Sequence, residues 1–322
     1  MKNFNPFPKS EIILMYYKKF KIIAIFAFLS YLTSIFKYFT STVNNLYNKQ
    51  IKICLCTMGK KENLYAKEFI EYYIKIGFDH LFIYDNNSPN TEKNNDILED
   101  KYKDKVTIYE GSKINITEQP QAYTDCYKKN KFNFDWILMI DMDEYFYIAN
   151  DTLKKYLSNV LFNKCDFIIY NWVLPTDNNL IYYDPRPLYE RFKGKYKISN
   201  QYKTMVKGNI SYLIYNVHSA KEYPSNKIFC DNEGKEINNE EKKIINIKKA
   251  YLMHYRYKST EEFVWKYKRN KNWLGVQEKP YLLESILWYF WLNEITLEKI
   301  NYIEKELNIN LDIYRKKIQN KT

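Results

Sequence analysis

The sequence predicts an α/β fold in which a mostly parallel sheet is flanked by helices. Between residues 51 and 140, short apolar runs alternate with segments whose apolar residues recur at helical spacing, which is typical of a right-handed parallel sheet. The run 136–140 (WILMI) is apolar at every position, as expected for a strand covered on both faces. A hydrophobic content of 46% in 322 residues is enough for a sizeable core.

The amino-terminal half of the domain reads as strands and helices in turn. A first strand is predicted at 51–56. From Asn63 onward, apolar positions recur at helical spacing until Gly77, a residue type that often follows a helix. A strand at 81–84 then ends in the polar turn 85–89. The pattern continues with a polar helix near 91–103, a strand at 106–109, a helix from about 119 to 130 and the strand at 136–140.

The carboxyl-terminal half has weaker periodicity. Short strands are predicted at 167–170 and 212–215, with Pro175, Pro185 and Pro187 breaking the loops. Residues from about 260 to 318 are rich in Trp, Leu and Lys. They predict two or more helices, with a break at Gly275 and Pro280.

The segment 22–36 (IIAIFAFLSYLTSIF) is a candidate membrane anchor because it carries no charge and is flanked by lysines. A helix of this length spans roughly 22 Å, short of the roughly 30 Å hydrocarbon core unless the lysines and Tyr38-Phe39 extend it. More lysines precede the segment than closely follow it, which favours a single-pass type II orientation with a luminal domain. An amphipathic or buried terminal helix, and a cytosolic location at a membrane surface, are the alternatives.

The composition narrows the classes of partner. A net charge of +12, mostly from lysine, suits anionic phosphates or a membrane surface. The chain has no Arg-rich stripe and no zinc-finger spacing, so nucleic acid is not an expected partner. Five cysteines cannot all pair, and Cys54 and Cys56, two apart on a predicted strand, are interpreted as core residues.

Three carboxylates, those of Asp141, Asp143 and Glu144, directly follow the buried strand at 136–140. In open α/β sheets, ligands collect beyond the carboxyl ends of the strands, where these side chains are expected. Asp141 and Asp143 point the same way on an extended chain, so their mutual repulsion requires a counter-charge. Their oxygen ligands favour Mg²⁺ or Mn²⁺. The alternative is a solvated loop after a strand.

Polar side chains follow other strands of the predicted sheet as well. Thr57 and Glu62 come after the first strand, and Asp85 comes after the second. Because the carboxyl ends of parallel strands meet at one edge, these residues and the acid cluster are expected to define one crevice. Asp85 either begins an ordinary Asx turn or supplies a carboxylate that holds a ribose or a base.

Two long stretches carry the most specific motifs of the chain: KKENLYAKEFIEYYIKIGFDHLFIYDNNSPN at 60–90 and QAYTDCYKKNKFNFDWILMIDMDEY at 121–145. With YERF at 189–192, KTMV at 203–206, VH at 217–218 and HYRYKSTEEFVWKYKRN at 254–270, they resemble glycosyltransferases of the GT-A fold. The resemblance is to family 92 (the former DUF23 group) and its relatives near family 2. The chain departs from the family pattern where Lys61 replaces an asparagine, Asn90 an aspartate, Asn270 a glycine and Leu174-Pro175-Thr176 a Phe-Gly-Ser.

The resemblance implies a GT-A (Rossmann-like) fold and an inverting, metal-dependent glycosyltransferase of the hexosyltransferase class. It implies that Thr57, Glu62 and Asp85 face the uridine of a UDP-sugar, with UDP-galactose as the family analogy. By the same resemblance, Asp141 and Asp143 hold the diphosphate through Mn²⁺ or Mg²⁺, and the acceptor is a glycan or a glycolipid. Related enzymes often use a late histidine as a further metal ligand; here His254 is favoured slightly over His218.

An inverting transfer needs a carboxylate that removes the proton of the acceptor hydroxyl. Glu262 is the first candidate for this base, and Asp177 and Glu190 are others. Ser259 and Glu262 also fit a capping box, a structural role that competes with catalysis. Lys203 is one of the basic residues that can meet the diphosphate.

The predicted organisation is a cytosolic tail at 1–21, a membrane anchor at 22–39, a stem at 40–50, a catalytic domain at 51–270 and a helical extension at 271–322. Within the catalytic domain, residues 51–150 form the nucleotide-binding half and residues 151–270 the acceptor half. Two other functions stay open at this point. They are a metal-dependent phosphodiesterase and a carbohydrate-binding protein without catalytic activity.

Overall fold

The computed structural model describes residues 28–37, 51–87, 93–274 and 278–319. It divides into two units, residues 1–50 and 51–322. In the first unit, residues 28–37 form a helix with exposed side chains. No helix in the described ranges is long and apolar enough to cross a membrane. Residues 28–37 of the predicted anchor at 22–39 lie in this helix, whereas its residues 22–27 and 38–39, like the tail and the stem, lie outside the described residues, so the anchor stays a prediction.

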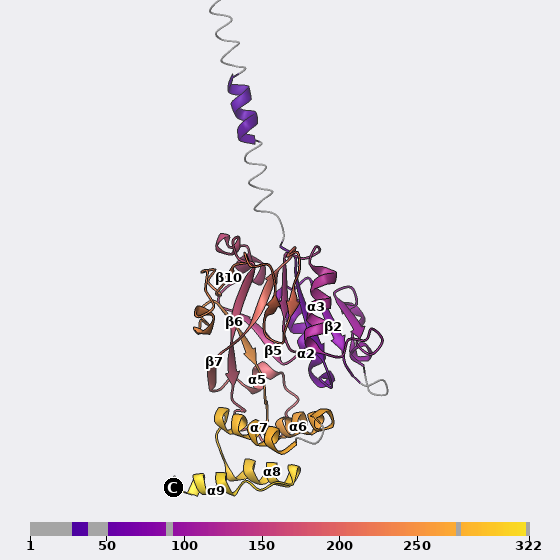
Figure 1. Cartoon of the computed structure of the whole chain (residues 1–322), viewed down its shortest axis with the longest axis vertical. Coiled ribbons are helices and arrows are strands. Elements are labelled where there is room, and N and C mark those ends of the chain that lie inside the picture. Colours follow the sequence, from indigo (N-terminus) through magenta and orange to yellow (C-terminus); the bar gives the residue numbers. More distant parts are fainter. Residues whose placement is uncertain (1–27, 38–50, 88–92, 275–277, 320–322) are drawn as a thin grey trace, which may run out of the picture. The chain divides into compact units, whose positions relative to one another are not determined.

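The second unit is built on a nine-stranded sheet flanked by helices (Figure 1). The strand order is β3-β2-β1-β4-β7-β6-β11-β5, and β10 pairs with β6. The strands of this sheet are β1 (Ile53–Gly59), β2 (His80–Asp85), β3 (Val106–Glu110), β4 (Trp136–Met139), β5 (Glu144–Ile148), β6 (Phe167–Pro175), β7 (Tyr196–Lys207), β10 (Phe229–Cys230) and β11 (Ala250–His254).

The sheet is parallel in its first half only. β1 pairs in parallel with β2 and β4, and β2 pairs in parallel with β3, as predicted. Beyond β4 the sheet is mixed, because β7 is antiparallel to β4 and β6, and β11 is antiparallel to β5. Residues 176–195 connect β6 to β7 and contain one short helix, α5 (Leu188–Arg191), and the two strands run antiparallel. The expectation of a mostly parallel, Rossmann-like sheet is thus corrected to a curled mixed sheet.

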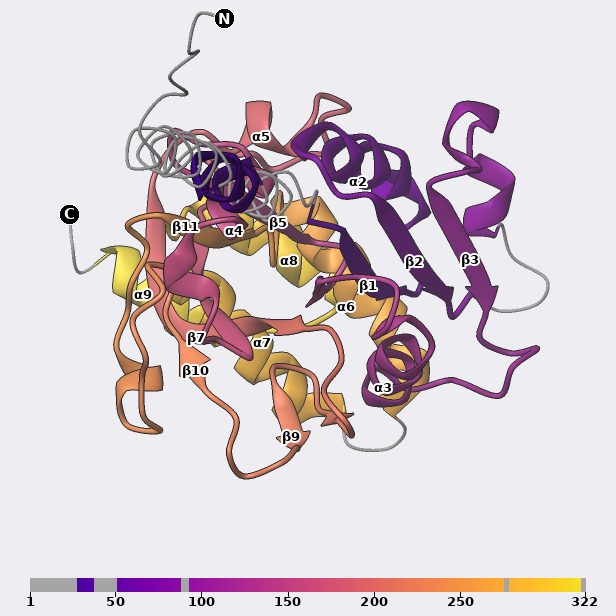
Figure 2. The same ribbon diagram turned by 90° about the horizontal axis from the view of Figure 1, so that it is seen from above.

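Two helices cover opposite faces of the parallel strands, α2 (Asn63–Ile76) and α3 (Gln119–Asn130) (Figure 2). Leu55 of β1 packs in the same core cluster as Phe69 of α2, whereas the neighbouring Cys54 packs in the cluster of Tyr123 of α3. Neighbouring residues of a strand point to opposite faces, so both faces of β1 are buried. This two-sided burial explains the continuous apolar runs of the sequence. Gly77 ends α2 in the left-handed conformation, with φ of 107°.

Two expected elements differ from the structure. The polar helix predicted near 91–103 is replaced by two short 3₁₀ helices, η1 (Asn94–Ile97) and η2 (Asp100–Tyr102), because this stretch has too few apolar residues for a continuous buried stripe. The strand predicted at 212–215 is reduced to β8 (Ile214–Tyr215), which pairs with β9 (Ala220–Glu222) in a separate two-stranded sheet. A further short helix, α4 (Leu153–Leu157), and two 3₁₀ turns, η3 (Val160–Phe162) and η4 (Glu241–Lys243), complete this region.

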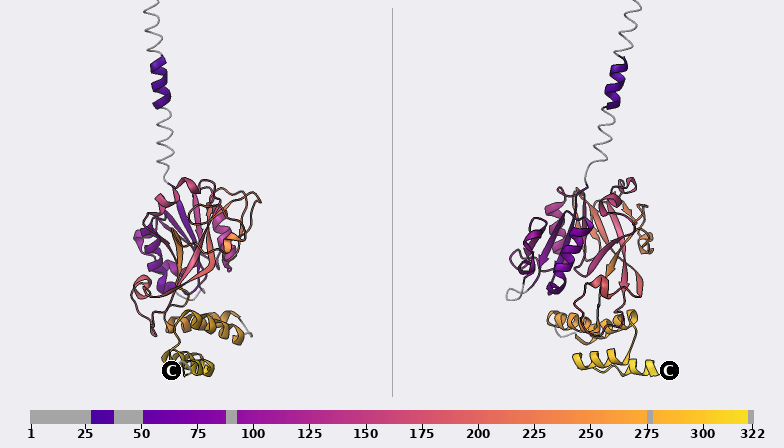
Figure 3. Two further views of the ribbon diagram at one scale, coloured as in Figure 1. Left: turned by 90° about the vertical axis from the view of Figure 1, so that its left-hand side faces the viewer. Right: turned by 180° about the vertical axis from the view of Figure 1, so that it is seen from behind.

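The carboxyl-terminal residues form four helices, α6 (Thr260–Leu274), α7 (Glu278–Leu292), α8 (Leu297–Leu307) and α9 (Asp312–Gln319). Figure 3 shows α6 and α7 in one layer, with α8 and α9 in a second layer below it. In line with the break expected at Gly275 and Pro280, α6 ends at Leu274 and α7 begins at Glu278, so Pro280 lies in the first turn of α7. Proline is tolerated there because first-turn N–H groups have no helical acceptor.

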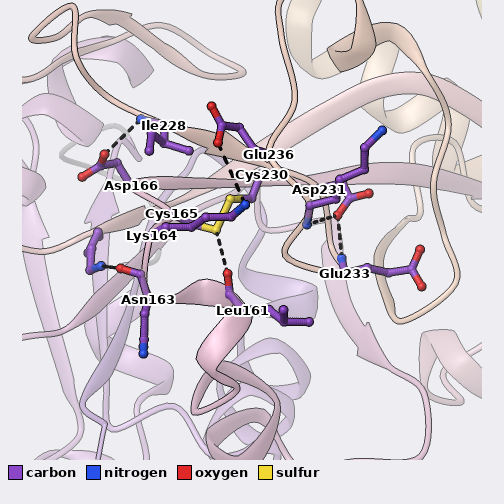
Figure 4. Close-up of a disulfide and its surroundings, with 12 residues drawn as sticks. Leu161, Asn163, Lys164, Cys165, Asp166, Ile228, Cys230, Asp231, Glu233 and Glu236 are labelled. Carbon is purple, nitrogen blue, oxygen red and sulfur yellow. Dashed lines mark hydrogen bonds and ion pairs between the residues drawn. A yellow bond between two sulfur atoms is a disulfide. The ribbon is translucent and has the colours of Figure 1, made fainter.

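Two disulfides connect elements that are distant in the sequence. Cys56 of β1 is bonded to Cys126 of α3, and Cys165, just before β6, is bonded to Cys230 of β10 (Figure 4). Cys54 is a free, buried thiol. The interpretation of Cys54 and Cys56 as core residues is confirmed, since both are fully buried, and Cys56 has a disulfide partner in addition. Cys56 faces the side of the sheet that α3 covers, and only the packing of that helix brings its partner close.

Candidate active site

The acid cluster lies in a tight turn between β4 and β5. Glu144 donates its backbone N–H to the carbonyl oxygen of Asp141 at 3.1 Å, and the backbone N–H of Asp141 donates to Oε2 of Glu144, also at 3.1 Å. Glu144 is fully buried and pairs with His254 across the antiparallel ladder of β5 and β11. Burial raises the pKa of Glu144 well above its ordinary value.

The carboxylate of Asp141 is held by side chains from α3 and β7. Its Oδ1 accepts hydrogen bonds from Lys203 Nζ at 2.9 Å, from the Tyr123 hydroxyl at 2.9 Å and from Gln119 Nε2. Lys203 is completely buried, while the Asp141 side chain keeps 31% of its surface exposed. Burial by itself would raise the pKa of Asp141, but the charge of Lys203 lowers it below the ordinary value. Asp141 is therefore an oriented anion with a face open to ligands.

The carboxylate of Asp143 is held from the opposite side. Its Oδ2 accepts from Lys266 Nζ of α6 at 2.7 Å, and its Oδ1 lies 3.4 Å from Nε2 of His254. Although burial raises the pKa of Asp143, Lys266 and His254 hold it well below its usual range. From the sequence, a bound cation is the expected counter-charge of the two aspartates. In the structure, two lysines already do so.

The donor set of a metal ion is only partly assembled by these residues. Asp141 and Asp143 supply hard oxygen ligands, but the described part of the chain contains no group of three or more His, Cys, Asp and Glu side chains placed to hold a metal. Mg²⁺ and similar ions are commonly bound by one or two carboxylates together with substrate phosphates and water. The aspartate pair therefore fits a cation that arrives with a phosphate-bearing ligand, and it does not form a closed protein cage.

Both candidate histidines contact the ring of Trp172. The His254 ring is 4.5 Å from the Trp172 ring, and the His218 ring is 5.3 Å from it. Burial lowers the pKa of both imidazoles. Neutral imidazole is the form that binds metals and accepts hydrogen bonds. His254 is the one that reaches Asp143, in line with its place ahead of His218 in the sequence-based ranking.

Two clefts meet at the aspartates. The first, named the β1 cleft, has a volume of about 500 Å³, and the second, named the α7 cleft, has about 490 Å³. The β1 cleft is lined by Met58, Lys60, Glu62, Asn86, Thr117, Glu118, Gln119, Pro120, Met142 and Val217. The α7 cleft is lined by Trp172, Leu174, Ser199, Gln201, both candidate histidines and residues of α6 and α7. Asp141, Asp143 and Lys266 line both clefts.

The three residues predicted to face a nucleotide have different positions. Glu62 lines the β1 cleft. Thr57 is fully buried and does not line either cleft. The Asp85 carboxylate accepts the backbone N–H of Asn87 at 2.8 Å, so it forms the Asx turn given as its alternative role, and the adjacent Asn86 reaches the β1 cleft instead.

Glu262, the first candidate for the catalytic base, lies in a buried ion pair. Its Oε2 accepts from Arg191 Nη1 at 2.8 Å, with side-chain exposures of 1% for Arg191 and 3% for Glu262. Ser259 and Glu262 also exchange the two hydrogen bonds of a capping box, at 3.1 and 3.3 Å. Glu262 does not line either cleft. Its placement is that of a structural residue. Asp177, another candidate, is likewise buried, in an ion pair with Lys299.

Sequence reasoning did not single out Lys266 or the tryptophans of α7. Lys266 is one of 50 basic residues, and it follows Asp143 by 123 residues, so the two meet only in the folded chain. Trp288 and Trp291 lie in a carboxyl-terminal stretch for which the sequence predicts helices and no functional site. Their exposed fractions of 43% and 46%, unusual for such large apolar side chains, become visible only in the folded chain.

A curled α/β sheet with an aspartate pair at the meeting point of two clefts agrees with the glycosyltransferase class that the sequence motifs resemble. Residues 49–279 match the model of glycosyltransferase family 92, and the chain belongs to this family.

Curated relatives of the chain are family 92 proteins of plants. A rice protein is 28% identical over 127 residues, which cover 35% of this chain and 20% of the rice protein. A castor bean (Ricinus communis) protein is 28% identical over 100 residues, 31% of this chain and 18% of the relative. An Arabidopsis thaliana protein is 23% identical over 125 residues, which cover 34% of this chain and 20% of that protein. The matched part thus spans about a fifth of the length of these relatives.

Proposed function

We propose that the chain transfers a sugar from a nucleotide-sugar donor in the β1 cleft to an acceptor in the α7 cleft. The observation that carries the proposal is that Asp141, Asp143 and Lys266 line both clefts. Sugar transfer requires the anomeric carbon of the donor and a hydroxyl of the acceptor to meet at one place. A residue group shared by two clefts provides such a meeting point, and the family membership of the chain supports the same reaction class.

The β1 cleft suits a UDP-sugar, with UDP-galactose as the first candidate. Glu62 and Asn86 supply polar groups at the ends of β1 and β2 for the uridine and ribose. Lys60 and Lys266 line the same cleft and supply positive charge for the diphosphate. Stabilising the departing nucleoside diphosphate lowers the barrier to transfer, because negative charge develops there as the glycosidic bond breaks.

We propose Mn²⁺ or Mg²⁺ as the counter-ion of the diphosphate, held by Asp141 and Asp143. The cation would supply Lewis-acid assistance to the leaving group. Lys203 keeps the Asp141 carboxylate oriented, and His254 orients that of Asp143. Lys266 contacts Asp143 from a position that also faces both clefts, so its ammonium group can pass from the carboxylate to a phosphate oxygen.

The acceptor side supports an inverting transfer to a glycan or a glycolipid. Because Glu262 is enclosed in its ion pair with Arg191, the proton of the acceptor hydroxyl needs another base. Glu284 of α7 is the carboxylate, apart from the two aspartates, among the described residues that line the α7 cleft. We therefore assign the role of general base to Glu284.

A membrane-anchored enzyme with a luminal domain is part of the same proposal. The two disulfides support an oxidising compartment, since such bonds persist in secretory spaces and are rare in the cytosol. The uncharged segment at 22–36 is the proposed anchor.

The test is a donor assay with a panel of UDP- and GDP-sugars, with Mn²⁺ and with a chelator. Release of nucleoside diphosphate is measured for wild type, Asp143→Asn and Asp143→Ala. The matched control is Asp100→Ala, an acid whose side chain is 92% exposed and lies on η2, away from both clefts. We expect turnover of a UDP-sugar, loss of at least 100-fold in both Asp143 variants and an unchanged control, since loss of charge stabilisation of about 3 kcal/mol corresponds to this factor.

Two outcomes would count against the proposal. Equal turnover in wild type and Asp143→Asn would remove the aspartate pair from the chemistry. Equal turnover with Mn²⁺ and with chelator would show that the reaction does not need a metal ion. Lys203 and Lys266 would then be the counter-charges of the aspartates and the diphosphate. Binding of UDP is measured in parallel by calorimetry, so that a folded variant without activity is distinguished from one that has lost the donor site.

A further inference from the structure

Helix α7 forms one wall of the α7 cleft. It spans Glu278–Leu292, whereas the match to the family model ends at residue 279. The residues of α7 that line the cleft are Glu284, Ser285, Trp288, Trp291 and Leu292. This wall therefore comes almost entirely from a part of the chain beyond the family match. It is the place where this chain can differ from its relatives in what it binds.

The lining residues form one stripe along α7. Glu284, Trp288 and Trp291 are spaced i, i+4 and i+7, which places them on one face of a helix. The two indole rings meet edge to face, with centroids 5.3 Å apart. Trp288 keeps 43% of its surface exposed and Trp291 keeps 46%. Lys197 Nζ lies 4.2 Å from the ring centroid of Trp291, and the Arg256 guanidinium lies 5.8 Å from that of Trp288. Each indole therefore carries a cation over its ring, while the rest of its exposed surface lines the cleft.

A buried polar network connects α7 to α6, to α8 and to the loop that follows β6. The hydroxyl of Tyr289, on the face of α7 away from the cleft, donates to Asp177 Oδ2 at 2.7 Å and lies 2.8 Å from Thr260 Oγ1. Lys299 of α8 forms an ion pair with the same Asp177 oxygen at 2.7 Å. Because this network is buried and fully paired, it holds the tryptophan face in one position. A preformed surface loses little entropy when it binds a ligand.

The chemistry of the α7 cleft combines flat apolar surfaces with hydrogen-bonding groups. Ser199 and Gln201 of β7 also line the cleft, and Glu284 lies on the same helix face as the indoles. A pyranose ring has the matching surface, because its C–H groups form an apolar face while its hydroxyls project around the edge. Aromatic side chains with one or two precisely placed polar groups are typical of small-molecule sites.

We propose that Trp288 and Trp291 form the acceptor subsite and bind a pyranose ring of a glycan by stacking. This inference rests on the proposed transferase function and assigns the residues that recognise its acceptor to a helix beyond the family match. The tryptophans are specificity-determining residues, which select the acceptor sugar by the shape of its apolar face. Glu284, one helical turn from Trp288, then lies beside a hydroxyl at the edge of the stacked ring.

The test is binding of the full chain to a printed array of natural glycans, followed by titration of the best soluble oligosaccharide with intrinsic tryptophan fluorescence. The variants are Trp288→Ala and Trp291→Ala. The matched control is Trp265→Ala, which removes a tryptophan of α6 that is 42% exposed and does not line either cleft. A second control, Leu287→Ala, changes an exposed residue of α7 outside the cleft. We expect at least tenfold weaker binding in the two cleft variants and no change in the controls.

Several results would overturn the acceptor subsite. Unchanged glycan affinity in Trp288→Ala and Trp291→Ala would do so, as would equal losses in the Trp265→Ala control. Absence of binding to every glycan on the array would also reject it, and binding to phosphatidylcholine or phosphatidylserine vesicles in place of glycans would assign the face to a membrane. UDP binding reports separately on the β1 cleft. Its absence in wild type would reject the proposed function, and an unchanged UDP affinity in the tryptophan variants confines their defect to the α7 cleft.

Discussion

Removal of the Cys165–Cys230 disulfide should destabilise the domain by an amount that follows from its position in the chain. The bond joins residues 65 apart in the sequence, between the start of β6 and β10. In the chain-entropy description, closing a loop of this length restricts the unfolded state by about 4 kcal/mol at 25 °C. With an unfolding entropy of about 2.1 cal/mol/K per residue over residues 51–322, the same loss lowers the Tm by about 8 °C.

The perturbation is a double-mutant cycle of Cys165→Ala, Cys230→Ala and the double variant. If the two sulfurs form one bond, either single substitution removes all of it. The double variant is then about as destabilised as each single one, and the costs do not add. Cys54→Ala is the control, because this buried thiol has no bond partner and its loss leaves only a small cavity worth about 1 kcal/mol.

The assay is chemical denaturation, followed by circular dichroism, together with mass analysis of unreduced proteolytic peptides. We expect a linked peptide pair containing Cys165 and Cys230 in the wild type. Dithiothreitol should destabilise wild type more than the double variant, which keeps only the bond between Cys56 and Cys126. Additive costs of the two single substitutions, or wild-type stability that is indifferent to reduction, would refute the reasoning.

Three other substitutions test separate features. Lys299→Met leaves Asp177 as a buried charge without its counter-ion, since both side chains are only 1% exposed. In urea denaturation the free energy of unfolding should fall by about 3–5 kcal/mol, and the double variant Lys299→Met/Asp177→Asn should recover part of this loss. Burial lowers the pKa of His80, so the folded chain binds fewer protons than the unfolded chain just below pH 6.5. The free energy of unfolding should therefore fall as the pH drops through this range. His80→Gln should make this free energy depend less on pH. Glu284→Gln should lower the rate of sugar transfer by about 100-fold without weakening UDP binding, and an equal rate in the variant would reject Glu284 as the base.

Local patterns in the sequence were sufficient for the first half of the fold. The helix expected from about 119 to 130 is α3 at the same residues, and the apolar run at 136–140 is the buried strand β4. These predictions succeed because periodicity and end signals are encoded within a few neighbouring residues. The second half was less predictable, because the pairing of β7 with both β4 and β6 depends on contacts between residues far apart in the chain.

The candidate site likewise contains residues that the sequence predicts and contacts that only the folded chain reveals. The sequence identified Asp141 and Asp143 from their place after a buried strand, and it gave His254 priority over His218. It did not predict that Lys203 and Lys266 would balance the two carboxylates, because these lysines follow their aspartates by 62 and 123 residues in the chain. The capping box of Glu262 was foreseen as an alternative. The sequence did not predict its buried ion pair with Arg191, which holds the Glu262 side chain outside both clefts.

The sequence by itself determined the family, the parallel half of the sheet and the carboxylates at its edge, because these depend on residue types at fixed local spacing. Only the tertiary structure decided the mixed half of the sheet, the cysteine pairing and the meeting of two clefts at the aspartates. Those features depend on which distant segments pack together. Packing of this kind is set by the shape and burial of the whole chain, and no short stretch of residues encodes it.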